Sequence, residues 1–292
     1  MTTALPDGAI AVTGAAGYVG RRLVQQLAEA GRPVVALIRP TQALPPGATR
    51  LDFDDTIDAE TLAEGLRDAG AVAAIHLAAR YVRHHQPADI GPLLASNVLA
   101  GALLLEAADE AGLRRVVVAD SAFAHQGPDG TRALGLYGAT RQALGRIADR
   151  YAVDRELDLT TLVVHDVYGP DDTRRRLVPV LVDALMDEVE IRLVGAPVTV
   201  DLVHVDDVAA AFRIAVLQGP AGTWAVRSTQ PLTPIEVADV LERVSGRRLK
   251  RRLVPAGIGP HPGTWAGPVL PGWSPTIPLD AGLTRLTQQL DD

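Results

Sequence analysis

The sequence VTGAAGYVG at residues 12–20 decides the fold, because it joins a short apolar run to the start of an amphipathic helical pattern. Residues 9–12 are all apolar, and apolar residues then recur three or four positions apart from Val19 to Ala30. The three glycines, at positions 14, 17 and 20, allow a sharp turn, close approach of backbone to a ligand, and close packing of a helix on a sheet. A helix that begins here presents free backbone N–H groups and a partial positive charge, which favour phosphate groups. The stretch therefore predicts a strand, a turn and a helix that bind the pyrophosphate of a dinucleotide.

The composition limits the class of protein. The 292 residues are 47% hydrophobic, with a net charge of −7 and a pI of about 5.5, and their arginine-rich patches at 174–176 and 247–252 are short. These features do not favour nucleic acid as a partner. The lack of cysteine excludes disulfides, thiolate catalysis and cysteine-ligated zinc, and no other residues have convincing metal-binding spacing. Without a signal-peptide pattern or an uninterrupted apolar run of about 20 residues, we expect a cytoplasmic protein with no membrane partner.

The end of the second expected strand, residues 33–38, indicates which cofactor binds. An NAD site usually places Asp or Glu there for the ribose 2′-hydroxyl, whereas an NADP site has an arginine nearby for the 2′-phosphate. Here Ile38 occupies that position and Arg39 follows it. We therefore expect NADP(H) to be favoured over NAD(H), with a merely solvated Arg39 as the alternative.

The rest of the chain alternates strands and helices and then changes character. Expected strands at 48–54, 71–79, 116–121 and 157–164 alternate with expected helices at 58–69, 93–111 and 137–154. This pattern predicts an α/β fold in which residues 1–169 form a Rossmann domain with a doubly wound parallel sheet. Short strands and helices follow, and residues 254–278 hold seven prolines and five glycines. We expect residues 170–292 to form a small C-terminal α+β substrate lobe, with the chain crossing back to the sheet around 199–217.

Seven short motifs keep one order along the chain: Thr13 to Gly20, His76 to Ala79, Asn97-Val98, Asp120-Ser121, Tyr137 to Arg141, Val167 to Pro170, and His204 to Val208. Together they resemble the extended short-chain dehydrogenase/reductases, the NAD(P)-dependent epimerase/dehydratase family, which acts largely on nucleotide sugars. The resemblance implies hydride chemistry at a carbonyl or alcohol carbon of a small-molecule substrate. It also implies a homodimer formed through the helices expected at 93–111 and 137–154.

The same resemblance implies a catalytic site of Ser121, Tyr137 and Arg141. Ser121 matches the residue that binds the substrate oxygen, and Tyr137 matches the phenol that exchanges a proton. A free tyrosine, with a pKa of about 10, needs a nearby cation to act as a base at neutral pH. The family has lysine four residues after this tyrosine, whereas this chain has Arg141, which shares the helix face but is a poor proton relay. A working site with a substituted lysine is the preferred hypothesis, and altered or lost activity is its competitor.

The strand ends and the family pattern together indicate the cofactor contacts: Gly14, Ala16, Gly17, Tyr18, Val19, Gly20, Arg39, Asp54, Leu77, Ala78, Ala79, Asn97, Tyr137 and Arg141. Asp55 is an alternative to Asp54 beside the adenine ring.

On the substrate side we expect His125, Asp166 and Arg175 to make contacts. His125 follows Ser121 on a loop at the mouth of the expected cleft, as a substrate contact or alternative proton donor. Asp166 and Val200 stand where the family usually has an Asn and an Arg that hold the substrate diphosphate. Either the arginines at 174–176 hold the phosphates instead, or the substrate has no diphosphate.

The sequence thus predicts an NAD(P)-dependent oxidoreductase, a reductase of a keto group. The first substrate implied by the resemblance is a 4-keto-6-deoxy nucleotide sugar in a biosynthetic pathway. Two alternatives remain: a nucleotide-sugar epimerase or dehydratase that uses a bound cofactor transiently, and a non-catalytic protein that senses the dinucleotide.

Overall fold

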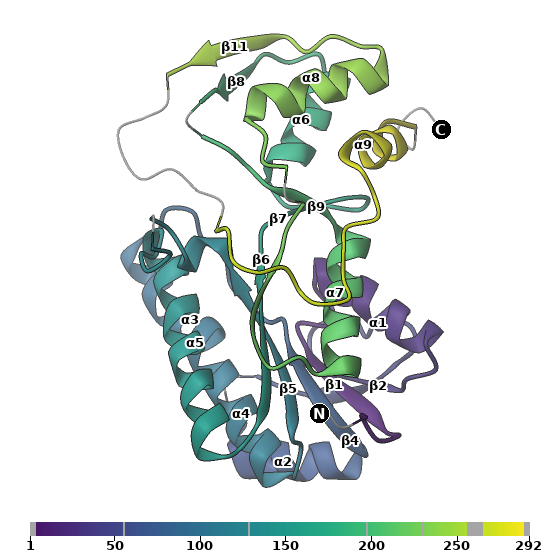
Figure 1. Cartoon of the computed structure of the whole chain (residues 1–292), viewed down its shortest axis with the longest axis vertical. Helices are drawn as coiled ribbons and strands as arrows, with labels where there is room; N and C mark the ends of the chain where they lie inside the picture. The colour runs from purple at the N-terminus through teal and green to yellow at the C-terminus, as the bar shows by residue number, and fades with distance from the viewer. Residues whose placement is uncertain are drawn as a thin grey trace.

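The larger part of the molecule is one parallel sheet (Figure 1). A computed structural model describes residues 4–54, 56–127, 129–196, 198–228, 230–255 and 265–288. The seven strands run in the order β10-β6-β5-β4-β1-β2-β3, and every neighbouring pair is parallel. Their bounds are β1 Ala9–Thr13, β2 Val34–Ile38, β3 Ala48–Asp52, β4 Ala71–His76, β5 Arg115–Ser121, β6 Asp158–Val164 and β10 Gly222–Val226. The predicted Rossmann fold is therefore confirmed.

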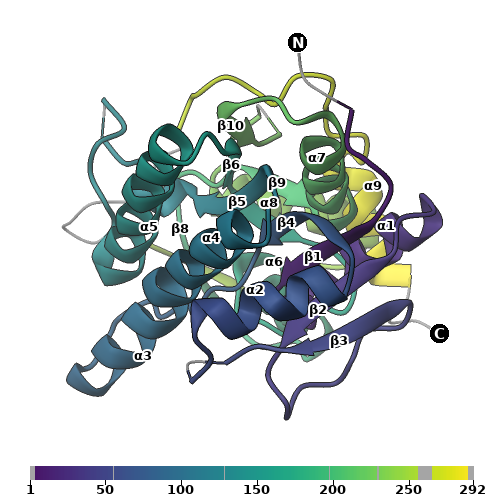
Figure 2. The same cartoon turned by 90° about the horizontal axis from the view of Figure 1, so that it is seen from below.

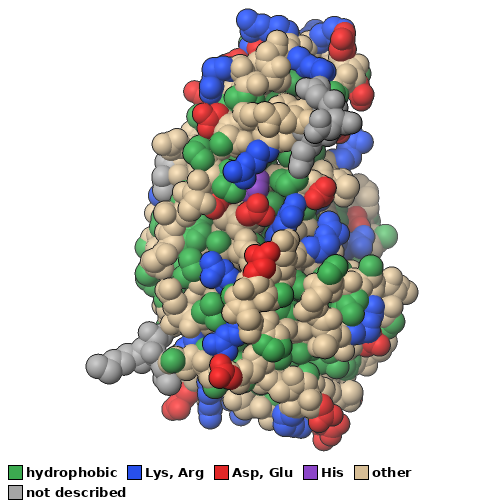
Figure 3. Space-filling model, turned by 90° about the vertical axis from the view of Figure 1, so that its right-hand side faces the viewer, with side chains coloured by type: hydrophobic (Ala, Val, Ile, Leu, Met, Phe, Trp, Pro, Cys, Tyr) green, Lys and Arg blue, Asp and Glu red, His purple; other side chains and the backbone are tan. Residues whose placement is uncertain are grey.

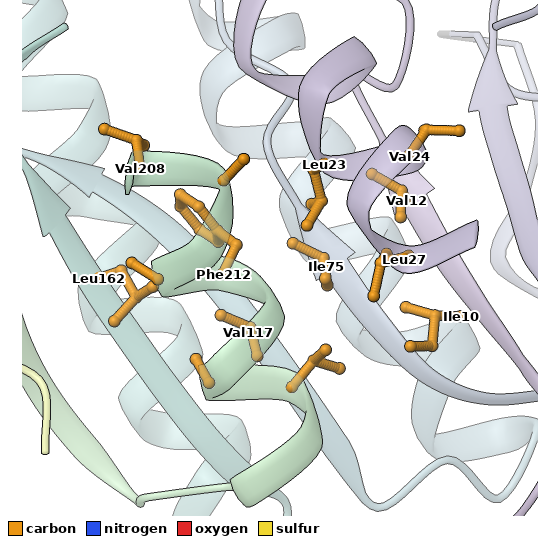
Figure 4. Packing of buried hydrophobic residues seen from close by; sticks show 14 of the residues in the cluster. Ile10, Val12, Leu23, Val24, Leu27, Ile75, Val117, Leu162, Val208 and Phe212 are labelled. Atoms are coloured by element: carbon orange, nitrogen blue, oxygen red, sulfur yellow. The ribbon is translucent and has the colours of Figure 1, made fainter. Parts of the chain in front are cut away.

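Helices cover both faces of this sheet (Figure 2). One layer holds α1 (Tyr18–Glu29) and α7 (Val205–Gln218), and the other holds α2 (Ala59–Asp68), α4 (Ala100–Glu110) and α5 (Gly135–Asp154). Figure 4 shows side chains of α1 and α7 packed over the sheet, with Leu23, Leu27 and Phe212 among them. Burial of both sheet faces explains why the central strands β1 and β2 are buried along their whole length, whereas the edge strand β3 is largely exposed.

One long helical stretch contains an irregularity beside the site. It consists of a short 3₁₀ turn (Pro87–Asp89), α3 (Ile90–Leu94), a π-helical segment (Ala95–Leu99) and α4. By length and composition Pro87–Glu110 is apolar enough to cross a membrane, because an 18-residue window within it has a mean hydropathy of 1.6. That is weak evidence, because the core helix of a soluble protein passes the same test, and α4 packs on α2 and α5. The π-helical segment is of interest because such segments are frequent at functional sites.

The remaining elements form a lobe at the carboxyl ends of the strands (Figure 1). It contains α6 (Leu177–Met186), β8 (Ile191–Val194), α8 (Pro234–Ser245), β11 (Arg251–Val254) and α9 (Leu279–Gln288). Two small parallel pairs, β8 with β11 and β7 (Asp166–Tyr168) with β9 (Leu202–His204), complete it. Between β9 and α8 the chain returns to the sheet as α7 and β10. This return is longer than the expected crossing at 199–217, so a single boundary at residue 169 does not divide the chain.

The described part of the proline-rich segment is irregular but anchored. Trp273 donates its indole N–H to the backbone oxygen of Asp207 (2.9 Å), and the Asp207 carboxylate accepts from Thr276 and Ile277 (2.7 and 3.0 Å). The tail is thereby fixed to α7. On the face shown in Figure 3, basic and acidic side chains are interspersed.

Candidate active site

The turn between β1 and α1 requires glycine. Gly14 has a φ of +68°, and a Cβ added there would lie 2.8 Å from the backbone nitrogen of Ala78. A Cβ on Gly20 would lie 2.1 Å from the backbone oxygen of Gly14. Gly17 caps α1 without a side-chain hydrogen bond, so the first N–H groups of the helix have no capping side chain. This backbone cradle fits the pyrophosphate of a dinucleotide.

A cavity of about 830 Å³ begins at this turn, at the carboxyl ends of the strands. It lies where β1 is flanked by β4 on one side and β2 on the other, so that the chain order reverses there. Doubly wound sheets bind ligands at such a position. The predicted residues that line this cavity are Gly14, Gly17, Tyr18, Val19, Gly20, Arg39, Asp54, Leu77, Ala78, Ala79, Ser121, Tyr137, Arg141 and Asp166.

Other predicted residues lie away from the cavity wall. Ala16, Asn97, His125 and Arg175 are not part of its lining, and Asp55 falls outside the described residues. Asn97 is buried in the π-helical segment, where its side chain binds the backbone N–H and oxygen of Arg80 (2.7 and 3.0 Å) and the hydroxyl of Thr140 (2.9 Å). Asn97 therefore holds the loop that forms the wall rather than facing the cavity.

Ser121 and Tyr137 reach the cavity from different elements. Ser121 ends β5 and is almost fully buried, and its hydroxyl accepts a hydrogen bond from the N–H of Phe123 (3.3 Å). Tyr137 lies in the first turn of α5, and its ring packs edge to face against Tyr81 and Phe123, with centroids 5.0 and 6.1 Å away. The aromatic contacts fix the orientation of the Tyr137 ring in the wall.

Arg141 ties together the ends of two strands. Its buried guanidinium donates to the backbone oxygens of Ala78, which follows β4, and Ala119 in β5. Close by, His76 binds the hydroxyl of Thr13 through Nδ1 (2.9 Å). Burial, together with the charge of Arg141, lowers the pKa of His76 to about 3, so the imidazole is neutral. Arg141 is thus a fixed positive charge beside a neutral histidine.

His125 and Asp120 form a pair next to Ser121. Nε2 of His125 lies 2.6 Å from Oδ2 of Asp120, whose other oxygen accepts from the N–H of Ser121 (2.7 Å). The His125 ring lies against Trp265, with centroids 5.0 Å apart. Burial would lower the pKa of His125, but the hydrogen bond and charge of Asp120 outweigh it and raise that pKa. The pair fixes the loop behind Ser121.

The substrate side contains three residues that the sequence motifs did not indicate. These are Tyr81, Phe123 and His165, which line the cavity together with Arg174 and Arg176 from the predicted arginine run. Burial lowers the pKa of His165 to about 4, which keeps its imidazole neutral at pH 7. In sequence, the position of Tyr81 two residues after the His76-to-Ala79 motif was a usable signal.

Of the three consecutive arginines, the structure turns the first and third toward the cavity. Arg174 binds both carboxylate oxygens of Asp172 (2.6 and 2.8 Å) and lies over the Tyr18 ring. Arg176 lies over the Tyr81 ring, 3.8 Å from its centroid. Arg175 is exposed and outside the lining.

Comparison with known proteins agrees with this architecture. The model of the NAD dependent epimerase/dehydratase family matches residues 10–226. The chain is 28% identical over 266 residues to a Streptomyces 3-diazoavenalumate denitrifying reductase, covering 86% of each chain. It is 25% identical over 206 residues to CDP-abequose synthase of Salmonella typhimurium, covering 70% of this chain and 68% of that one.

Among solved structures, MoeE5 in complex with UDP-glucose and NAD superposes with a TM-score of 0.84 at 28% identity, covering 98% of this chain and all of that one. The dinucleotide in that complex is NAD. Since the family model matches well over half of the chain, this protein belongs to the NAD-dependent epimerase/dehydratase family and is an enzyme of the extended short-chain dehydrogenase/reductase type.

Proposed function

We propose that this enzyme reduces a carbonyl group with NADPH. The observation that carries the proposal is that Ser121, Tyr137 and Arg141 line the same cavity as the glycine turn of residues 14–20. Hydroxyl donors and a cofactor cradle in one cavity are what hydride transfer to a ketone requires.

The residues have separable roles. The hydroxyl of Ser121 donates a hydrogen bond to the carbonyl oxygen of the substrate, and the hydroxyl of Tyr137 gives that oxygen its proton. Arg141 fixes the ends of β4 and β5 and places a positive charge on the side where negative charge develops. The bound nicotinamide would supply the hydride.

The preference for NADP(H) is supported by the end of β2. Ile38 ends the strand, and Arg39 follows it at the cavity wall with an exposed side chain. An arginine at this position is suited to bind the 2′-phosphate of NADP. An NAD site usually has an acidic residue at the end of this strand. The NAD in the MoeE5 structure favours NAD(H) instead.

Two kinds of substrate have support. CDP-abequose synthase and the UDP-glucose complex of MoeE5 favour a nucleotide sugar, including the 4-keto-6-deoxy sugar implied by the motifs. The relative named 3-diazoavenalumate denitrifying reductase favours a substrate that is not a nucleotide sugar.

The alternative reaction is that of an epimerase, which uses a retained cofactor transiently. It predicts turnover of the substrate without net consumption of NADPH.

We also propose a homodimer. The stretch Pro87–Glu110 exposes Ile90 and Leu94, and α5 exposes Val153. A second copy packed on these helices would bury these apolar side chains.

The test is a titration of the purified protein with NADPH and with NADH, followed by absorbance at the nicotinamide band with a panel of ketones and keto sugars. We expect tighter binding of NADPH and its oxidation only when a carbonyl substrate is present. Tight binding without oxidation by any substrate would favour the sensing alternative. Product formation without net oxidation would favour the epimerase, and preference for NADH would contradict the role of Arg39.

A further inference from the structure

The wall of the cavity beyond Ser121 is aromatic. Tyr81, Phe123 and Tyr137 pack edge to face, and the centroids of Tyr81 and Phe123 are 6.0 Å apart at an interplanar angle of 70°. The three rings come from different segments, a loop after β4, the turn after β5 and the start of α5, and all line the cavity. Such a wall favours a flat, unsaturated group.

The arginines of the cavity differ in how far they are neutralised. Arg80 pairs with Asp89 (3.4 Å), Arg141 is bound to backbone oxygens, and Arg174 is held by Asp172. Arg39 lies at the other end, beyond the glycine turn. In the part of the chain that the structure describes, the guanidinium of Arg176 has no hydrogen bond or ion pair, and its contact is the ring of Tyr81.

The groups around Arg176 leave its charge available. Asp166 also lines the cavity, where burial raises the pKa of its carboxyl and the charge of Arg176 opposes that rise. His165 is neutral at pH 7, since its pKa is about 4. The guanidinium of Arg176 therefore offers N–H donors in a planar fork, which matches one carboxylate.

A diphosphate finds less support. It carries more than one negative charge and calls for several charged or polar donors. Val200, at the position where the resemblance leads one to expect arginine, packs with the core of the lobe and pairs through its backbone with Leu232 (2.8 Å). Arg174 is already neutralised by Asp172, and Arg175 lies outside the cavity.

We propose that the substrate is a planar aromatic or conjugated carboxylic acid that also carries the carbonyl group to be reduced. Its carboxylate binds Arg176, its ring lies against Tyr81 and Phe123, and its carbonyl reaches Ser121 and Tyr137. This substrate class rests on the proposed reductase function. The net reaction adds a hydride to the carbonyl carbon and a proton to its oxygen, with oxidation of NADPH to NADP⁺.

The test is calorimetric titration of the full-length protein, saturated with NADP⁺, with 4-hydroxycinnamate, its methyl ester and UDP-glucose. We expect 4-hydroxycinnamate to bind and both the ester and UDP-glucose to bind at least tenfold more weakly. Arg176→Gln should weaken binding of the acid about tenfold or more, which corresponds to about 1.4 kcal/mol. Arg192→Gln, an exposed arginine on β8 outside the cavity lining, is the matched control and should bind like the wild type.

The outcomes that overturn the proposal are distinct. They are tighter binding of UDP-glucose than of the acid, no binding of either ligand, unchanged binding of the acid by Arg176→Gln, or an equal loss in Arg175→Gln. Circular dichroism and NADPH titration of each variant separate misfolding from a local effect.

Failure of the reductase function has a different signature. In that case 4-hydroxycinnamate binds through Arg176, but 4-acetylbenzoate and related aromatic oxo acids oxidise no NADPH. The carboxylate site would then stand without the proposed reaction.

Discussion

The two halves of the cavity are built in different ways. The part of the cofactor half that is shaped for the pyrophosphate is one contiguous stretch, residues 13–20, whose backbone turn leaves no room for a Cβ at Gly14 or Gly20. The substrate half is made by side chains from separate segments, with Tyr81 after β4, Asp166 in β7 and Arg176 before α6. Backbone groups bind any pyrophosphate alike, whereas side chains select among substrates. We therefore expect side-chain substitutions in the substrate half to change substrate binding more than cofactor binding.

The largest expected effect comes from the residue that serves both halves. Tyr137→Phe keeps the ring that packs on Tyr81 but removes the proton donor, so kcat should fall by about 10² to 10⁴. NADPH binding should change little. Steady-state kinetics with any accepted carbonyl substrate tests this. Tyr151→Phe is the control, because Tyr151 lies on the same helix but binds Glu106 outside the cavity lining (2.5 Å). Equal kcat in Tyr137→Phe and wild type would contradict the assignment.

The next effect should be confined to the cofactor half. In Gly20→Ala, the added methyl group meets the backbone of Gly14 and Ala15, which cannot move aside as a flexible side chain can. We expect destabilisation of about 1–3 kcal/mol and weaker NADPH binding. Denaturant unfolding and NADPH titration measure both. Gly145→Ala, in a helix with open space around the glycine, should be neutral or slightly stabilising. Similar stability and NADPH affinity in the two variants would contradict a steric clash at Gly20.

A smaller effect concerns the choice of cofactor. Arg39→Gln removes the charge expected to face the 2′-phosphate, so NADPH should bind about tenfold more weakly, roughly 1.4 kcal/mol. NADH binding should stay the same, because NADH has no group for this charge. Parallel titration of one protein sample with both cofactors makes NADH the internal control. An equal change in the affinity for both cofactors would show that Arg39 does not bind the 2′-phosphate.

The smallest effect is pH-dependent and lies behind Ser121. Because the folded pKa of His125 is raised, the charged pair with Asp120 contributes stability below the unfolded pKa of about 6.5 and loses it as pH rises through the folded pKa. His125→Gln retains a donor for Asp120 without the charge. The free energy of unfolding of the wild type should therefore exceed that of the variant by about 1 kcal/mol at pH 6. This difference should vanish at alkaline pH. Urea unfolding across this range tests it, and a difference that grows with pH would contradict the assigned direction.

Local patterns predicted the cofactor half well because its signals are contiguous. Periodicity and the glycine spacing placed β1, α1 and β2 within a residue or two of their observed bounds. The expected strand at 71–79 ends at His76 instead, because residues 77–79 leave the sheet to line the cavity. The helices α6 and α9 and the strand β10 were not predicted, because each contains a proline or a glycine that interrupts its pattern.

The substrate half depends on contacts between distant residues. No spacing in the sequence shows that the ring of Tyr81 lies under Arg176. Choosing among three consecutive arginines requires knowing where α6 begins, and Arg176 is its N-cap. Asn97 belongs to a family motif, but the motif alone does not show whether it touches the cofactor or, as here, holds the loop at Arg80.

The most direct test of the account is a crystal structure of the complex with NADP⁺. We expect the pyrophosphate at the start of α1, the 2′-phosphate beside Arg39, and the nicotinamide beside Ser121 and Tyr137. A nicotinamide that lies away from both hydroxyl groups, or a cofactor bound in the reverse direction along the cavity, would contradict it.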